Sequence, residues 1–265
     1  MNDLMPLTTE QHLLILNALN LTTAFMGGAA LLFTLLRSQV ASAYRLALSL
    51  MAAAVGMASY HYWQLLGGWK AAYVLQGGTY VPTGQPFNDA FRYADWLGTV
   101  PLILAALMLV LDIGRRKSAS LVARLAGAAV LMIGLGYLGE VQHENLGLRA
   151  AWGAASCVPF GYILFVLWSE LRGVLRFETP RVRELFTGLR VLLMASWSLH
   201  PLVYALPLLG LGGAPAFVLG QVGHSVADVC AKVFYGLMIY AVAREKTLSE
   251  EMLLGLEAPR EVVRS

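Results

Sequence analysis

Four ionisable side chains stand inside long apolar stretches of this sequence, where they could support chemistry. Lys232 follows Asp228 by four positions. Asp95 follows Arg92 by three, so the members of each pair would lie on one side of a helix. An ionisable group in a membrane-spanning helix costs about 3 kcal/mol or more, and such groups are therefore usually paired or functional. Two interpretations stay open: a buried salt-bridge network that orients helices, or a reactive lysine.

The reactive interpretation depends on the amine of Lys232. Desolvation favours the neutral, nucleophilic amine, which can form an imine with an aldehyde. A protonated imine needs a counterion, which Asp95 and Asp228 could supply while Arg92 balances the surplus negative charge. Large side chains that could enclose a ligand, and glycines that leave room for it, are Trp96, Met132, Phe160, Trp197 and Tyr204, with Gly134, Gly136 and Gly139. Each of these could also be ordinary helix packing.

A membrane-embedded helical bundle is the scaffold that the composition predicts for these residues. The 265-residue chain is 58% hydrophobic and 13% charged, which leaves too little polar surface for a soluble protein. Continuous apolar runs of about 20 residues suit membrane-spanning helices, whereas barrel strands would be shorter and alternate. The turn-rich segment 206–215 divides the last run. We therefore expect an all-α membrane protein with seven transmembrane helices near residues 11–36, 46–69, 90–113, 120–141, 150–169, 182–206 and 217–243.

Basic residues mark the two ends of the predicted bundle. Most of the 19 lysines and arginines fall on one side, whereas Lys70 and Arg149 lie on the other. Because positive charge is retained in the cytoplasm, the N-terminus should be extracellular and the C-terminus cytoplasmic. The longest extracellular loop carries a hairpin signal at 76–84. Residues 1–246 would form the transmembrane domain, and 247–265 a short cytoplasmic tail.

Three segments resemble the signatures of one protein family. Arg92–Leu102 resembles a third-helix signature, and Asp228–Lys232 resembles the seventh-helix signature that contains a retinal-binding lysine. Trp197–Pro201 resembles the sixth-helix segment that packs against the polyene. In this order, these segments resemble a microbial (type I) rhodopsin over essentially the whole chain. Ser59–Trp63 and Gly136–Glu140 are similar to the proteorhodopsin and xanthorhodopsin branch of bacterial light-driven proton pumps.

The resemblance implies a role for each ionisable residue. Lys232 would carry all-trans retinal as a protonated Schiff base. Asp95 would be the primary counterion and proton acceptor, with the Thr99 hydroxyl hydrogen-bonded to it. Asp228 would be the second counterion. Arg92 would be the gate toward the outside.

Three histidines and a set of lining residues complete the implied site. His61 is similar in position to a second-helix histidine that pairs with the acceptor carboxylate, and a packing role is its alternative. His200 stands where a tyrosine is usual beside the second counterion, and His224 lies one helical turn from Asp228. Both either tune the carboxylates or act as neutral hydrogen-bonding substitutes. The retinal would be lined by Trp96, Ile103, Met132, Gly136, Ser156, Phe160, Trp197, His200 and Tyr204.

The predicted function is outward proton pumping driven by light. Asp228 lies one helical turn closer to the outside than Lys232, and Asp95 also lies in the outer half, so a departing proton would move outward. We expect a multi-pass protein of the cell (inner) membrane that is a transporter rather than an enzyme. Its expected partners are retinal, protons and the lipid bilayer. Homo-oligomers are expected, and neither a metal nor a nucleic acid is.

Three features depart from the family pattern. Ala106, eleven positions after Asp95, stands where these pumps typically carry a carboxylic proton donor, which predicts a slow, pH-dependent late photocycle. The last extracellular loop, 206–218, has no carboxylate, so proton release would follow uptake. Gly153 falls where many relatives have a tryptophan. It either opens a window for a carotenoid antenna or allows tighter helix packing.

A photosensor is the main alternative function, because a slow cycle suits signalling. Without a fused effector, such a sensor would act through a separate transducer. Chloride, sodium and inward proton pumps fit less well, because those branches usually alter residues that this chain retains as Asp95, Thr99 and Asp228.

Overall fold

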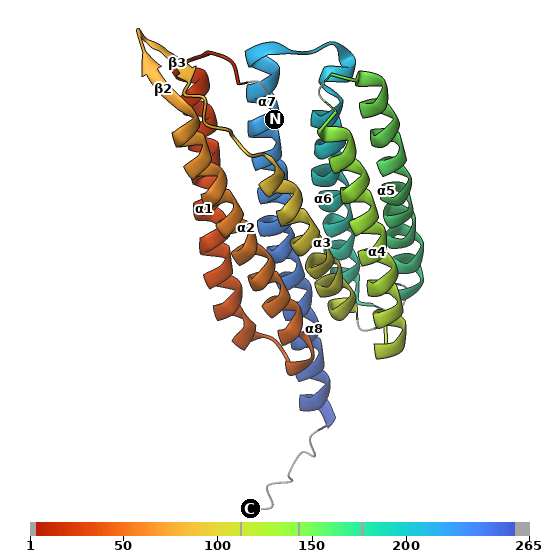
Figure 1. The fold of residues 1–265 in the computed structure, drawn as a ribbon. Coiled ribbons are helices and arrows are strands. Elements are labelled where there is room, and N and C mark those ends of the chain that lie inside the picture. Colours follow the sequence, from red (N-terminus) through yellow and green to blue (C-terminus); the bar gives the residue numbers. More distant parts are fainter. Residues whose placement is uncertain (1–3, 112, 143, 176–177, 258–265) are drawn as a thin grey trace, which may run out of the picture.

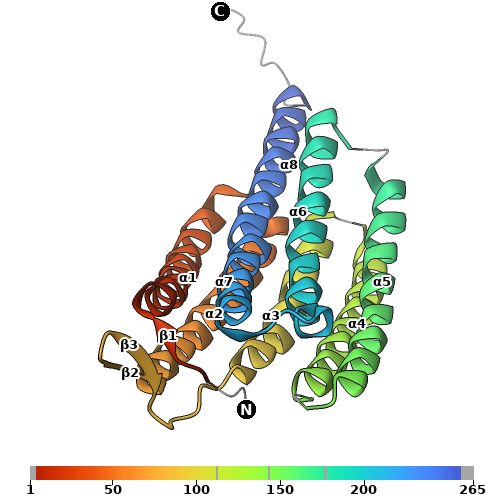
Figure 2. The same cartoon turned by 90° about the horizontal axis from the view of Figure 1, so that it is seen from above.

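Seven segments form a closed bundle in the computed structural model, which describes residues 4–111, 113–142, 144–175 and 178–257 (Figure 1). They are α1 (Thr9–Leu36), α2 (Arg45–Ala72), α3 (Ala90–Leu111), α4 (Arg115–Glu140), α5 (Leu146–Leu175), α6 (Pro180–Ala205), and a last rod made of α7 (Gly213–Val229), the π-helical turn η4 (Cys230–Phe234) and α8 (Tyr235–Glu257). Each helix packs against the next, and α7 packs against α1, which closes the ring (Figure 2). The predicted all-α, seven-helix membrane fold is confirmed.

Helix starts and connections follow from the local sequence. Thr8 caps α1 in a reciprocal box with Gln11, with hydrogen bonds of 3.2 and 3.0 Å. Thr179 caps α6 by accepting from the Val182 backbone N–H, and Pro180 occupies the first turn. Short 3₁₀ turns connect neighbouring helices: η1 (Arg37–Gln39), η2 (Ser42–Tyr44) and η3 (Pro207–Leu209).

A three-stranded sheet marks one end of the bundle, which we call the hairpin end. Strands β1 (Leu7–Thr8) and β2 (Tyr73–Gln76) both pair antiparallel with β3 (Thr79–Pro82). Gly77 and Gly78, with φ of 55° and 85°, make the two-residue turn of the hairpin, which requires a left-handed backbone. The hairpin that the sequence predicts therefore forms. The opposite end, where α8 projects toward the C-terminus, is the tail end (Figure 1).

Two helices extend well beyond the C-terminal ends of their predicted apolar runs. The last rod continues past position 243 to Glu257, and α5 continues past 169 to Leu175. Within the described residues, six segments are long and apolar enough to cross a membrane, with α7 to α8 counted as one. The seventh, α6, is less apolar because arginines and a glutamate occupy its first half. Charged residues thus lower the hydropathy of a segment, and so end its apolar run, without ending the helix.

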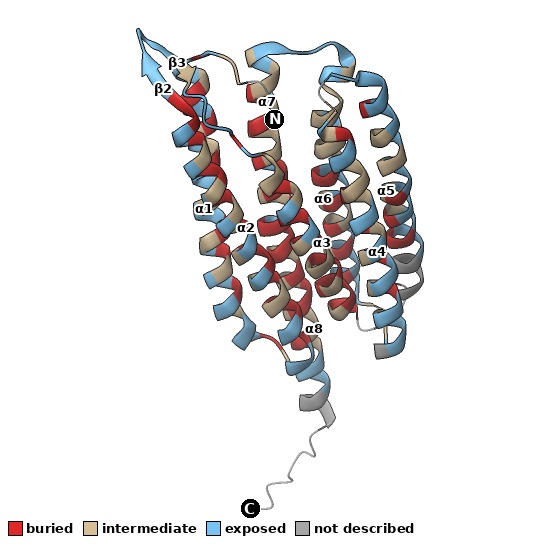
Figure 3. Cartoon of the chain, viewed as in Figure 1, coloured by how far each residue is buried: buried red, intermediate tan, exposed pale blue. Residues whose placement is uncertain are grey.

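The bundle exposes large apolar side chains and encloses a small set of polar ones (Figure 3). Phe25, Leu31, Val158 and Phe165 are each more than half exposed. The buried polar side chains include Arg92, Asp95, Thr99, Gln221, Ser225, Asp228 and Lys232. A hydrocarbon solvent explains the exposed apolar surface, and the chain is a multi-pass membrane protein.

Candidate functional site

Lys232 is buried in the bundle at the centre of the π-helical turn η4, with a side chain that is 1% exposed. Its Nζ lies 2.5 Å from Asp228 Oδ1, one turn earlier, and 3.0 Å from Asp95 Oδ2 on α3. Both carboxylates are as buried as the lysine. The structure thus brings together the lysine and both aspartates that the sequence singles out.

Asp228 is held by donors from three helices. Besides Lys232, Trp96 Nε1 donates to Oδ1 at 3.0 Å, and the Tyr62 hydroxyl donates to Oδ2 at 2.7 Å. Such donors stabilise an ionised carboxylate. Sequence reasoning missed Tyr62, and the available signal was its place directly after His61 in an aromatic segment of α2.

Asp95 has fewer donors than Asp228. His61 Nδ1 approaches its Oδ1 to 3.4 Å, so the two predicted partners do lie in contact. The Thr99 hydroxyl donates to the backbone carbonyl of Asp95 at 2.8 Å, not to the carboxylate. This corrects the expected role of Thr99. Inside a helix, a threonine hydroxyl readily reaches the carbonyl four residues earlier.

Arg92 is buried between the lysine and the hairpin end. Its Nη1 donates to the Tyr62 hydroxyl at 3.0 Å and its Nη2 to Gln221 Oε1 at 2.7 Å. Gln221 Nε2 in turn donates to the Asp89 carboxylate at 3.1 Å. Arg92 therefore reaches Asp228 through Tyr62. The sequence did not point to Gln221 or Asp89, which approach from α7 and from the segment before α3.

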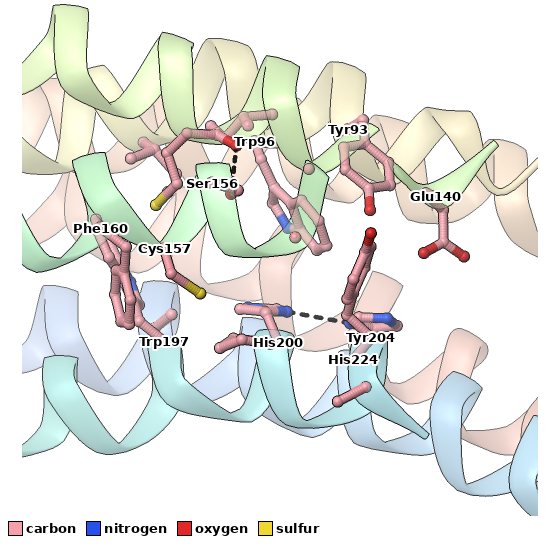
Figure 4. A pocket seen from close by; sticks show the side chains of 18 of the residues that line it. Tyr93, Trp96, Glu140, Ser156, Cys157, Phe160, Trp197, His200, Tyr204 and His224 are labelled. Atoms are coloured by element: carbon pink, nitrogen blue, oxygen red, sulfur yellow. Dashed lines mark hydrogen bonds between the residues drawn. The ribbon is translucent and has the colours of Figure 1, made fainter. Parts of the chain in front are cut away.

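A cavity of about 290 Å³ lies beside Lys232 (Figure 4). All nine residues that the sequence assigns to the lining face it: Trp96, Ile103, Met132, Gly136, Ser156, Phe160, Trp197, His200 and Tyr204. Its walls follow α5 from Ala150 to Phe160, about 15 Å along the helix axis. Tyr93, Cys157 and His224 also line it, and the sequence had not assigned them to the lining. A long apolar chamber with a buried amine suits a long apolar aldehyde.

Three glycines leave room for side chains at this cavity, and two of them, Gly136 and Gly153, line it. A Cβ on Gly136 would lie 3.5 Å from the Ser156 hydroxyl. A Cβ on Gly153 would lie 2.6 Å from a Tyr204 ring carbon, and one on Gly139 would collide with the Tyr204 hydroxyl. Tyr204 therefore packs directly on two glycine backbones. Gly134, which the sequence grouped with them, faces open space instead.

A second cavity, of about 270 Å³, lies nearer the hairpin end, and we call it the hairpin-end cavity. Arg92, Asp89 and Glu140 line it, and Trp96 and His224 line both cavities. The loop 206–218 contributes no carboxylate, as the sequence shows. Two carboxylates nevertheless reach this cavity from other elements.

The described interior between Lys232 and the tail end is mainly apolar. Ala106 is fully buried there, next to Leu107 and near Val110. Among the residues that the structure describes, Asp95 and Asp228 are the only buried carboxylates. The described part of this half therefore supplies no buried carboxylic proton donor.

Comparisons with known proteins give one consistent result. The sequence profile described as "Bacteriorhodopsin-like protein" matches residues 13–246. The green-light absorbing proteorhodopsin of Gamma-proteobacterium EBAC31A08 is 27% identical over 226 residues, which cover 84% of each chain. The crystal structure of a thermophilic rhodopsin is 47% identical with a TM-score of 0.89, covering 93% of this chain and 99% of that one. Xanthorhodopsin, described as a light-driven ion pump with dual chromophore, is 40% identical with a TM-score of 0.90, covering 94% and 99%.

Proposed function

The chain belongs to the bacteriorhodopsin-like family of microbial type I rhodopsins, and from this premise we propose that it is a light-driven outward proton pump that carries all-trans retinal on Lys232. One observation carries the proposal. The Lys232 amine lies between two buried carboxylates at an apolar cavity of about 290 Å³. Relatives named as proteorhodopsins and as a light-driven ion pump support the light-driven activity.

The residues present fit retinal. The cavity is lined mainly by aromatic and aliphatic side chains, and Gly136 leaves space that a Cβ would narrow. Two carboxylates and Arg92 balance a cation at the Lys232 nitrogen. When bound there as a protonated Schiff base, retinal supplies a light-driven change of shape that loosens the proton at this nitrogen.

Asp95 is the better acceptor of that proton. Asp228 keeps hydrogen bonds from Trp96 and Tyr62 after the lysine nitrogen loses its charge, and these bonds stabilise its ionised form. Asp95 lies 3.0 Å from Lys232 Nζ without comparable donors on its carboxylate. Its remaining polar neighbour is His61, at 3.4 Å.

The direction of transport follows from the asymmetry of the bundle. Basic residues such as Arg37, Arg45 and Arg244 gather toward the tail end, which assigns that end to the cytoplasm. The polar groups near Lys232 lead toward the hairpin end, which is then outside. Because Ala106 replaces a donor, we expect resupply of the proton from the cytoplasm to be slow and to slow further as the pH rises.

Illuminated cells test the proposal. Cells that express the chain and are supplied with retinal should acidify their medium in the light, and an uncoupler should abolish the change. Alkalinisation that the uncoupler abolishes would contradict outward pumping.

The second candidate is a photosensor that signals through a separate transducer. The observation that favours it is the apolar tail-side half around Ala106, because slow resupply prolongs the light-activated state. A sensor would bind retinal but move few or no net protons. A pigment in cells whose medium stays at constant pH would therefore favour the sensor.

We also propose that the protein binds a carotenoid antenna in addition to retinal. Xanthorhodopsin is described as having a dual chromophore, and Gly153 lines the cavity of this chain. The Tyr204 ring packs on Gly153, so a carotenoid would meet that ring first.

We also expect homo-oligomers in the membrane, which crosslinking of the membrane-embedded protein would detect.

A further inference from the structure

Two histidines in contact connect the cavity beside Lys232 with the hairpin-end cavity. His200 Nδ1 on α6 and His224 Nδ1 on α7 lie 3.1 Å apart, and the two rings lie at 18° to each other (Figure 4). His200 lines the first cavity, and His224 lines both. We propose that this pair, which we call the histidine relay, carries the exported proton from the carboxylates at Lys232 to the hairpin-end cavity. The inference deepens the proposed outward pumping and rests on it.

The contact between the rings requires one shared proton. Each neutral imidazole carries a proton on one ring nitrogen and accepts with the other. A pair that meets through two Nδ1 atoms must therefore have one donor and one acceptor, and both Nε2 atoms are left to exchange protons with their surroundings. An imidazole can therefore accept a proton at one ring nitrogen and give one up from the other.

His200 faces the carboxylate that the site leaves ionised. Its Nε2 lies 3.8 Å from Asp228 Oδ1, slightly beyond hydrogen-bond range, so the proposed transfer requires the ring to move closer to the carboxylate. The charged groups that act on the relay are Asp228 and Lys232 from α7 and η4, and Arg92 and Asp95 from α3. When the lysine nitrogen gives up its proton, Asp228 loses its closest counter-charge. Its negative charge then favours a proton on His200.

The hydrogen-bonded chain through Arg92 cannot carry the proton in place of the histidine relay. Asp228, Tyr62, Arg92, Gln221 and Asp89 form a continuous hydrogen-bonded chain toward the hairpin end. A guanidinium has only donors and stays protonated, so it cannot take up a proton from Tyr62. This chain fixes the position of Asp228 but blocks proton transfer along itself.

The transfer balances in protons and bonds. The proton on Asp95 passes to Asp228, which lies at the same Lys232 nitrogen, and from Asp228 Oδ1 it forms an N–H bond at His200 Nε2. The shared proton crosses from His200 Nδ1 to His224 Nδ1, and the His224 Nε2–H bond breaks to release a proton into the hairpin-end cavity. Tautomer exchange in both rings restores the starting arrangement. One proton enters and one leaves, and no redox partner is needed.

The test compares His200→Gln and His224→Gln with a matched control, His12→Gln. Glutamine keeps a polar group but does not titrate. His12 is a buried histidine that stacks on Tyr80, and it lines neither cavity. Time-resolved infrared spectroscopy of the retinal-loaded protein follows the carboxyl band of protonated Asp95, and a pH-sensitive dye follows the medium.

Asp95 should gain its proton at the wild-type rate in all variants but lose it about 100-fold more slowly in both relay variants, the low end of what a positioned proton-transfer group contributes. His12→Gln should match the wild type. Wild-type loss of the Asp95 proton in either relay variant would overturn the relay. A wild-type protein that gives no outward dye signal would instead refute the proposed pump.

A measurement without substitutions covers the case in which the variants do not fold. In the wild type with isotope-labelled histidine, the infrared bands of a histidine ring should change after Asp95 gains its proton and recover as it is lost. Histidine bands that stay constant through this interval would overturn the relay.

Discussion

The two halves of the bundle differ in what they bury on either side of Lys232. Toward the hairpin end lie two carboxylates, Arg92 and a pair of histidines. Toward the tail end lies an apolar interior around Ala106. Among the described residues, buried carboxylates that could accept a proton from the lysine nitrogen therefore lie on the hairpin side only. The difference teaches that a few polar side chains, placed on one side of the lysine, would be enough to give the proposed pump its direction.

Removing the lysine should have the largest effect, because both halves meet at its nitrogen. Lys232→Ala should leave no visible absorption band after retinal is added, since the covalent bond needs the amine. Lys246, which pairs with Glu178 at 2.8 Å in the tail-side half, offers a matched control. Lys246→Ala should form the pigment, and a wild-type pigment in Lys232→Ala would show that retinal binds elsewhere.

Removing the proton acceptor on the hairpin side of Lys232 should abolish proton transport but leave the retinal pigment. Asp95→Asn should stop light-driven transport and shift the absorption to the red, because the ground-state cation loses a counter-charge 3.0 Å away. The pH trace of illuminated cells and the absorption spectrum check both effects. Glu178→Gln is the control and should transport normally. Transport that persists in Asp95→Asn would mean that Asp228 or another group accepts the proton.

Adding a carboxylic proton donor on the tail side of Lys232 should give that side a buried titratable group, as the hairpin side already has. Ala106→Glu should speed the late photocycle and remove its dependence on pH between neutral and alkaline conditions, because the proton then comes from a fixed group. In the wild type, the same step should slow as the pH rises. Flash photolysis over this pH range measures it. Equal pH dependence in the two proteins would show that resupply does not pass position 106.

Filling the glycine beneath Tyr204 should have the smallest effect on transport. Gly153→Phe forces the Tyr204 ring away, at a cost of about 1–3 kcal/mol for overpacking. Pumping should continue, while the shift of carotenoid bands that we expect on mixing with the wild type should not occur with this variant. A Gly153→Phe protein that still shifts those bands would place the carotenoid elsewhere.

Much of the site is predictable from the sequence because several of its residues lie close together on the same helix. Asp228 and Lys232 are one turn apart, and the lining residues recur within recognisable segments. The partners of Arg92 were not predictable, since Tyr62 and Gln221 come from other helices and meet it only through helix packing. The contact of His200 with His224 has the same origin.

Local geometry explains the remaining differences between the structure and the sequence-based predictions. The Thr99 hydroxyl turns to the carbonyl of its own helix, which spacing along the chain cannot distinguish from a bond to the carboxylate. The last rod runs to Glu257 because helix formation tolerates the charged residues that end a hydropathy signal.

The most direct test of the asymmetry is the side on which protons accumulate. Membrane vesicles should be sorted by whether the hairpin residues 77–84 are accessible to a label from outside, then loaded with retinal and illuminated. Vesicles with the hairpin outward should acidify their medium, and those with the hairpin inward should acidify their interior. Accumulation at the tail end, or equal pH on both sides, would contradict outward transport from Lys232 toward the hairpin end.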